Sequence, residues 1–297
     1  MKPKLLTRER LIGTTVGIVL ASIAFIFGLR MLETDMTFRP VPLSGNINPP
    51  KGAEDVWLNT TDGVRLHGWF FKSRRESASA TVIYFHGNGG NITNDAWVAE
   101  NLAGRGFDAL LLDYRGYGQS QGEPRSESDL YTDGDAALAY VVNQRRVPLD
   151  RVVLYGQSLG TVVAVDLAAR HQCAAVILES GLSSASSVAS RALPWLPRAF
   201  HFLGRNRFES ARKLKNVTAP LLITHGDPDP VISADEARTL FASANEPKKL
   251  LIYPGVGHNV FGSLGDSYLQ VIEEFIRTSL AKVDSKQGSL SDNRRPH

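Results

Sequence analysis

Residues 151–170, RVVLYGQSLGTVVAVDLAAR, form the stretch that decides the fold. The stretch begins with a β-branched apolar run typical of a buried strand and ends with a run whose composition suits a helix. Between them lies Gly156-Gln157-Ser158-Leu159-Gly160, whose glycines permit a tight turn with a strained backbone at the serine. We therefore expect Ser158 at the tip of a strand-to-helix turn, above the carboxyl edge of a sheet.

Strand and helix patterns alternate on both sides of this turn, which predicts an α/β fold with a mostly parallel sheet in a three-layer sandwich. Five of the strand runs are almost entirely apolar, as expected for central strands that are buried on both faces. An antiparallel hairpin through Thr61-Asp62-Gly63 is predicted at one edge. The predicted strands are 64–71, 80–85, 107–112, 151–155, 174–178, 220–224 and 249–253, and the predicted helices are 94–105, 126–143, 158–170, 234–244 and 266–281.

The N-terminal segment is predicted to be a transmembrane signal anchor. Residues 11–29, LIGTTVGIVLASIAFIFGL, carry no charge and form a helix long enough to cross a hydrocarbon core of about 30 Å. Four basic residues precede the segment, whereas only Arg30 follows it before Glu33 and Asp35. The positive-inside rule then predicts a single-pass membrane protein with a cytoplasmic N-terminus and a periplasmic or lumenal body.

Two other interpretations of this segment remain open. In a cleavable signal peptide, residues 11–20 would be the apolar core and Ser22-Ile23-Ala24 the cleavage site. This is less favoured because Phe25, Ile26 and Phe27 follow directly, where the chain should have become polar. A buried core helix is also less favoured, because the segment is apolar on all sides rather than on one stripe.

Composition and charge narrow the class of protein. The chain has 297 residues, 43% of them hydrophobic, and a single cysteine, Cys173, so an intrachain disulfide framework is excluded. The net charge of +3 comes from the two ends of the chain, and the body between them is mildly acidic, so no nucleic-acid partner is expected. The predicted organisation is a basic N-terminus (1–10), the anchor (11–29), a linker (30–54), a folded domain (55–281) and a disordered tail (282–297).

A serine hydroxyl needs a histidine base, and the base needs a carboxylate to orient it. His258 is the favoured base, because it lies in a glycine-rich loop after the last predicted strand. Asp227 and Asp229 follow the preceding strand, and their spacing alone does not show which of the two is the acid. Five other histidines are interpreted as structural or surface residues: His67, His171, His201, His225 and His297.

A second glycine-rich turn, HGNGGN at residues 86–91, follows the predicted strand 80–85. Such a turn brings backbone N–H groups close to a ligand, and together with the N–H of Leu159 it is a candidate oxyanion hole. The phosphate-binding and dinucleotide-binding glycine motifs are missing from the sequence, which argues against nucleotide or NAD binding. Neither a cofactor nor a metal is expected.

These motifs together resemble the α/β-hydrolase fold, and most closely its membrane-anchored α/β-hydrolase-domain proteins. The resemblance covers about residues 55–280 and includes HGNGGN (86–91), DYRGYGQSQGEP (113–124), GQSLG (156–160), HGDPDPVI (225–232) and GVGHN (255–259).

The resemblance implies a role for each matching residue. It makes Ser158 the nucleophile, His258 the base and Asp229 the acid, with oxyanion donors at the backbone of Asn88 and Leu159. It places a short cap at about residues 183–215 and gives Arg115 a structural role.

The sequence therefore predicts a membrane-anchored serine hydrolase that cleaves carboxylic esters or thioesters and that meets the lipid bilayer. The resemblance makes acyl-protein thioesters, lysophospholipids and lipid esters plausible substrates. A serine peptidase on the same fold and a catalytically silent, membrane-anchored binding protein are the alternatives, because a fold does not choose among substrates.

Overall fold

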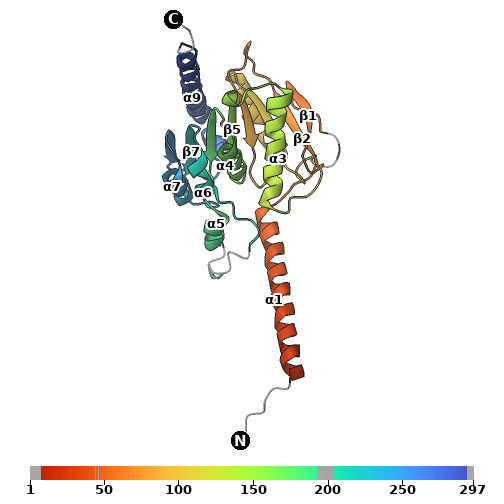
Figure 1. Cartoon of the computed structure of the whole chain (residues 1–297). Coiled ribbons are helices and arrows are strands. Elements are labelled where there is room, and N and C mark those ends of the chain that lie inside the picture. Colours follow the sequence, from red (N-terminus) through yellow and green to blue (C-terminus); the bar gives the residue numbers. More distant parts are fainter. Residues whose placement is uncertain (1–7, 44, 46, 193–194, 196–203, 293–297) are drawn as a thin grey trace.

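A computed structural model describes residues 8–43, 45, 47–192, 195 and 204–292 (Figure 1). Its centre is an eight-stranded sheet with the strand order β1-β2-β4-β3-β5-β6-β7-β8. The strands are β1 (Ala53–Asn59), β2 (Arg65–Phe71), β3 (Thr81–Phe85), β4 (Asp108–Leu112), β5 (Val152–Gln157), β6 (Ala175–Glu179), β7 (Leu221–Gly226) and β8 (Lys248–Tyr253).

The pairing of the strands confirms the predicted fold class. Strand β2 is antiparallel to both β1 and β4, and the pairs from β4 through β3, β5, β6 and β7 to β8 are parallel. The predicted hairpin lies at the edge of the sheet, where Asn59 pairs with Arg65 around the turn. The five strands β3 to β7 each bury most or all of their residues, which explains their continuous apolar sequence.

Helices cover both faces of the sheet. One face packs against α3, α4 and α7, and the other against α2, α8 and α9. Among the described residues, helices α5, α6 and α8 are elements that the sequence analysis did not predict. The covering helices are α2 (Ile92–Gly104), α3 (Glu127–Ala139), α4 (Gly160–Arg170), α5 (Ala185–Ala192), α6 (Ser210–Lys213), α7 (Ala234–Ser243), α8 (Val260–Leu264) and α9 (Asp266–Asp292).

The C-terminal segment corrects one expectation. Helix α9 does not end at Ala281 but continues to Asp292, so the segment predicted to be disordered from Lys282 is helical to that point. An ion pair joins Asp284 in this continuation to Arg151 of the body, a contact that the polar composition alone did not show.

The strand-to-helix turn between β5 and α4 requires its glycines for close approach rather than for flexibility alone. A Cβ atom on Gly160 would lie 1.9 Å from the carbonyl oxygen of Phe85, and one on Gly156 would lie 2.4 Å from that of Gly160. The backbone of Ser158 has a φ of 52°, a left-handed conformation that non-glycine residues rarely adopt. The glycines therefore let helix α4 pack directly on the end of β3, which fixes Ser158 at the tip of the turn.

Helix α1 (Arg8–Thr37) is longer than the predicted anchor and includes the first part of the predicted linker. Its segment Ile12–Thr37 is the one helix in the described part of the chain that is long and apolar enough to cross a membrane. The charge-free run marked the apolar core of the helix but not its end, which comes shortly before Pro40.

The rest of the predicted linker packs on the body instead of forming a spacer. Phe38 is buried in the core. Leu43 donates its N–H to the carbonyl of Gly118, and Gly118 donates in return to Val41. The sequence did not show this, because prolines and glycines suit a packed irregular segment as well as a linker.

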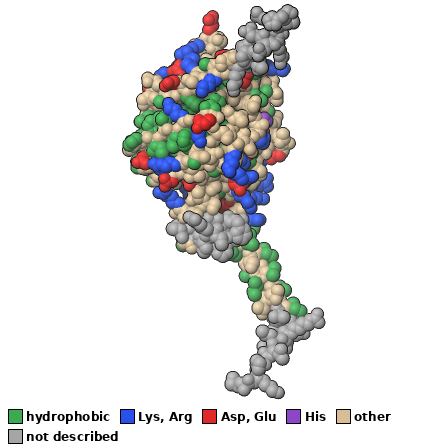
Figure 2. Space-filling model, turned by 60° about the vertical axis from the view of Figure 1, so that its left-hand side comes forward, with side chains coloured by type: hydrophobic (Ala, Val, Ile, Leu, Met, Phe, Trp, Pro, Cys, Tyr) green, Lys and Arg blue, Asp and Glu red, His purple; other side chains and the backbone are tan. Residues whose placement is uncertain are grey.

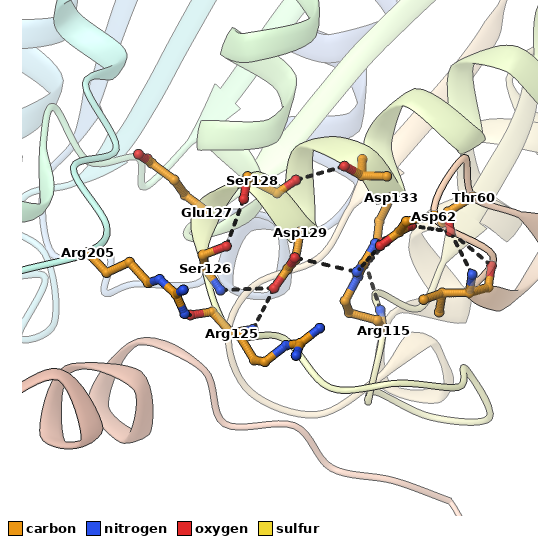
Figure 3. A network of polar contacts seen from close by, with 12 residues as sticks. Thr60, Asp62, Arg115, Arg125, Ser126, Glu127, Ser128, Asp129, Asp133 and Arg205 are labelled. Carbon is orange, nitrogen blue, oxygen red and sulfur yellow. Dashed lines mark hydrogen bonds and ion pairs between the residues drawn. The ribbon is translucent and has the colours of Figure 1, made fainter. Parts of the chain in front are cut away.

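The loop 113–124 is held by Arg115, whose side chain is buried and fully engaged (Figure 3). Its guanidinium donates to Asp133 on α3 at 2.8 and 2.9 Å and to Asp62 in the β1–β2 hairpin at 2.7 and 3.1 Å. The hydrogen bonds from Arg115 lower the pKa of Asp62 to about 2, whereas burial raises that of Asp133 to about 6. Arg115 thus joins a hairpin, a loop and a helix.

Candidate active site

Three side chains from three loops meet at the carboxyl edge of the sheet. The Nε2 atom of His258 lies 3.0 Å from the Oγ of Ser158, and its Nδ1 atom lies 2.7 Å from the Oδ2 of Asp229. Ser158 follows β5, Asp229 follows β7 and His258 follows β8. The structure therefore brings the predicted nucleophile, base and acid into one hydrogen-bonded chain.

The structure separates the two candidate acids. Asp227 is exposed, whereas Asp229 is buried and its Oδ1 accepts from the N–H groups of Val231 at 2.8 Å and Ile232 at 3.0 Å. Burial opposes ionisation of Asp229, but hydrogen bonds from His225 and His258 outweigh it and hold its pKa well below the usual range. Asp229 is thus an ionised acceptor for the imidazole at neutral pH.

His225, interpreted as structural from the sequence, lies behind the acid. Its Nε2 atom is 3.1 Å from the Oδ2 of Asp229 and 2.9 Å from the carbonyl oxygen of Ile232. The ring is completely buried, so its contact with the carboxylate does not compete with water. His225 therefore helps to fix the orientation of Asp229.

The loop that carries His258 is fastened to the end of β6. Ser180 donates its hydroxyl to the carbonyl oxygen of His258 at 2.7 Å. The adjacent Glu179 is buried and accepts from the hydroxyl of Tyr155 and from the N–H of Phe261 at 3.0 Å. Burial raises the pKa of Glu179. The sequence analysis did not identify these contacts, because Glu179 and Ser180 belong to no recognisable motif.

The predicted oxyanion donors lie beside Ser158. The N–H of Ser158 itself donates to the carbonyl of Glu179 at 2.8 Å, but within the described chain the N–H groups of Leu159 and Asn88 have no hydrogen-bond acceptor. Leu159 directly precedes helix α4, whose N-terminal end carries a partial positive charge. A Cβ on Gly87 would lie 3.3 Å from that of Ser158, so the glycine turn approaches the serine closely.

A cavity of about 280 Å³ opens at these residues. Ser158, Leu159 and Asn88 line its floor, and the cap helix α5 and the C-terminal part of α1 line its walls. A second depression of about 610 Å³ lies at the opposite edge of the sheet, near Arg151 and Arg277, and contains none of the predicted site residues. Of these two hollows, the smaller one is therefore the one that contains predicted site residues.

The other candidate residues lie elsewhere. His67 is buried in β2, with its Nε2 2.6 Å from the carboxylate of Asp55, and His171 follows helix α4. His201 and His297 lie outside the described residues, as does most of the apolar part of the predicted cap. Within the described ranges, His, Cys, Asp and Glu side chains form no group of three or more suited to a metal ion.

This chain matches a family model and several known proteins. A family model described as "alpha/beta hydrolase fold" matches residues 80–219. Rv2307c, an uncharacterized protein of Mycobacterium tuberculosis, is 37% identical over 220 residues, which are 74% of this chain and 76% of that protein. Alpha/beta hydrolase domain-containing protein 17B of Xenopus laevis is 36% identical over 231 residues, 77% of each chain.

A solved structure supports the same architecture. The esterase Pf2001 of Pyrococcus furiosus matches with a TM-score of 0.68 over 82% of this chain and 97% of that chain. Its sequence is 20% identical, so the likeness concerns the fold.

Proposed function

This chain belongs to the α/β-hydrolase family, and on that premise we propose that it is a serine hydrolase that cleaves carboxylic esters or thioesters. The observation that carries the proposal is the hydrogen-bonded chain from Ser158 through His258 to Asp229, with distances of 3.0 and 2.7 Å. A serine on a strained turn, a histidine within reach of its hydroxyl and a buried carboxylate behind the histidine form the arrangement that activates a serine nucleophile.

The mechanism follows from the positions of these groups. Asp229 accepts from Nδ1–H of His258, which leaves Nε2 free to accept the proton of Ser158. The Oγ of Ser158 attacks the acyl carbon, and the imidazolium then gives the proton to the leaving alcohol or thiol. Water then attacks the acyl-enzyme and loses its proton to His258, and the bond to the Oγ of Ser158 breaks as His258 returns this proton to it, which releases the carboxylic acid and restores Ser158.

The oxyanion of each tetrahedral intermediate would be stabilised by the N–H groups of Leu159 and Asn88. Both belong to residues that line the cavity next to Ser158. Fixed backbone donors of this kind favour the transition state over the ground state, because they are aimed at a charge that develops only during the reaction. The donor end of helix α4 adds to this effect.

The walls of the cavity favour an acyl substrate over a peptide. Leu182, Val188 and Phe208 are among the side chains that line it, and Glu33 is the one charged residue in its described lining. An ester or thioester with an apolar acyl group suits such walls. The structural likeness to an esterase agrees with this choice, although the fold alone does not select a substrate.

We also propose that helix α1 anchors the protein as a single-pass membrane protein with the N-terminus in the cytoplasm. Two observations support it: the length and apolar character of Ile12–Thr37, and the basic residues that precede the helix. The catalytic body would then lie on the periplasmic or lumenal side.

A labelling experiment tests the catalytic proposal. Membranes that contain the wild type are treated with a fluorophosphonate probe, which reacts with an activated serine, and are compared with Ser158→Ala, Asp229→Asn and Asp227→Asn. We expect no labelling of Ser158→Ala and a rate on the order of 10³–10⁴ lower for Asp229→Asn, because the imidazole loses its orienting acceptor. Asp227→Asn is the matched control and should react like the wild type.

The opposite results are equally informative. A folded wild type that does not react would favour the silent binding protein. Equal loss in Asp227→Asn and Asp229→Asn would reject the assigned acid. Cleavage of peptides but not of esters by the reactive protein would favour the peptidase.

A further inference from the structure

The cavity at Ser158 is not formed by the catalytic domain alone. Helix α1 supplies Leu29, Leu32 and Met36 to its lining, and helix α5 of the cap supplies Val188 and Ala189. In Figure 1 both helices lie at the same end of the molecule, where α1 leaves the body. The proposed membrane anchor is therefore also a wall of the active-site cavity.

The one charged residue in the described lining, Glu33, is engaged by the cap. Its Oε2 accepts from the N–H of Arg205 and its Oε1 from the N–H of Asn206, each at 2.7 Å. A carboxylate that binds two successive backbone N–H groups forms charge-assisted bonds with defined geometry. Glu33 thus fastens the cap to α1, and three of the other four α1 side chains that line the cavity, Leu29, Leu32 and Met36, are apolar.

The position of α1 is also fixed at the catalytic end. The N–H of Arg39 donates to the Oδ1 of Asn88 at 2.8 Å, and the hydroxyl of Tyr117 donates to the same oxygen at 3.0 Å. Asn88 is the residue whose N–H we assign to the oxyanion hole. The segment that follows α1 therefore contacts the glycine-rich turn 86–91 directly, and the wall formed by α1 has a definite place relative to Ser158.

The cavity lies close to the proposed membrane surface. The charge-free run ends at Leu29, the first α1 residue in the lining, and Thr37 is the last. At ~1.5 Å per residue these two positions are about 12 Å apart along the helix axis. Figure 2 shows hydrophobic side chains along α1 as it leaves the body, and Leu32 and Met36 are 43% and 37% exposed. Apolar surface thus runs from the outside of α1 into the cavity.

We propose that the space between α1 and α5 is a binding site for one fatty acyl chain that enters directly from the bilayer, with Leu32 and Met36 as specificity-determining residues. The inference rests on the proposed serine hydrolase and narrows its substrate to esters or thioesters with a long, membrane-inserted acyl chain. An acyl chain that moves along α1 stays in contact with apolar surface from the lipid to Ser158, so it avoids exposure to water.

Variants that narrow the site provide the test. Full-length Leu32→Trp and Met36→Trp in phospholipid vesicles are compared with the wild type on two esters of one chromogenic alcohol, with a butyryl or a palmitoyl group. We expect the palmitoyl-to-butyryl ratio of kcat/KM to fall roughly tenfold or more, because excluding two or three methylenes is sufficient for such a loss. Met31→Trp is the matched control, since Met31 is exposed on the same helix and does not line the cavity.

An unchanged ratio in both tryptophan variants would overturn the acyl site. If the proposed function itself is wrong, the result is different: Ser158→Ala will not abolish the hydrolysis of either ester. Fluorophosphonate labelling of each variant separates a misfolded protein from a narrowed site. Leu32→Ala widens the site, so this variant should still hydrolyse the palmitoyl ester. Loss of activity on the palmitoyl ester but not on the butyryl ester would also contradict the proposal.

Two further substrates distinguish the source of the acyl chain. Vesicles carry either a palmitoyl lysophospholipid or a peptide with a palmitoyl thioester. The same Leu32→Trp variant should lose activity on whichever of them the wild type hydrolyses. Hydrolysis of neither by a protein that cleaves the butyryl ester would reject a membrane-inserted substrate.

Discussion

At Asp229, burial and hydrogen bonding act on one carboxylate in opposite directions. The hydrogen bonds prevail, and the pKa of Asp229 is lower in the folded chain than its ordinary value of 3.8. A carboxyl group with a lowered pKa stabilises the fold at pH values above its ordinary pKa, and this contribution is lost as the pH falls through the folded value. Asp229, the carboxylate of the proposed triad, thus also contributes to the stability of the folded protein, and this contribution is lost at low pH.

The corresponding prediction concerns unfolding below pH 4. We expect the free energy of unfolding of the wild type to fall more steeply from pH 4 to pH 2 than that of Asp229→Asn, by up to about 1.4 kcal/mol for each pH unit, because one proton is taken up on unfolding. Denaturant titrations at several pH values measure these slopes. Asp227→Asn should keep the wild-type slope, and an unchanged slope in Asp229→Asn would contradict the lowered pKa.

At the scale of the elements, Arg115 joins parts of the chain that the sheet does not connect directly. Its partners Asp62 and Asp133 lie in the first hairpin and in helix α3, and Asp133 is completely buried. Removing the arginine would leave a buried carboxyl group without its cation. Removing one partner of a buried ion pair destabilises a protein by more than the intact pair stabilises it, because the desolvation free energy of the remaining charge is then no longer compensated.

We therefore expect Arg115→Ala to lower the free energy of unfolding by ~3–5 kcal/mol. Chemical denaturation of the two proteins at pH 7 measures the difference. Arg238→Ala is the control, because its ion pair with Asp235 is exposed and should change stability by less than about 1 kcal/mol. A similarly small effect of Arg115→Ala would show that the network in Figure 3 adds little to the fold.

At the scale of the whole molecule, the sheet, the cap and α1 are arranged around one cavity. Helix α9 ends at the opposite end of the molecule from α1 (Figure 1). The C-terminal end of α9 therefore lies away from both the cavity and the proposed membrane surface.

This arrangement allows a test of the membrane orientation. A reporter that is active only outside the cytoplasm, fused after His297, should be active when the full chain is expressed. The same fusion with a reporter that works only in the cytoplasm should be inactive, and the reverse pair of results would overturn the proposed orientation. Extraction of the wild type by detergent but not by high salt would establish that it is an integral membrane protein.

The sequence was sufficient to predict the sheet and its strand-to-helix turn, because both depend on local patterns of residues. The apolar run before Gly156 and the glycines around Ser158 are informative without any knowledge of distant residues. Two other features could not be predicted in the same way. Whether the segment after α1 spans a gap or packs on the body depends on a partner, Gly118, that lies far along the chain. The contact between Arg151 and Asp284, in the part of α9 beyond Ala281, likewise joins residues that lie far apart along the chain.

By itself the sequence determined the α/β class, the apolar helix near the N-terminus and Ser158 with its candidate partners, because periodicity, glycine spacing and charge are written along the chain. The spacing of Asp227 and Asp229 left the acid open and the resemblance implied Asp229, but only the tertiary structure shows that Asp229 is the carboxylate buried against His225 and His258. It also decided that α1 lines the catalytic cavity, with Glu33 bound to the backbone of Arg205 and Asn206. The physical reason is that backbone N–H groups carry no sequence signature, so a contact between a side chain and distant main chain exists only once the chain has folded.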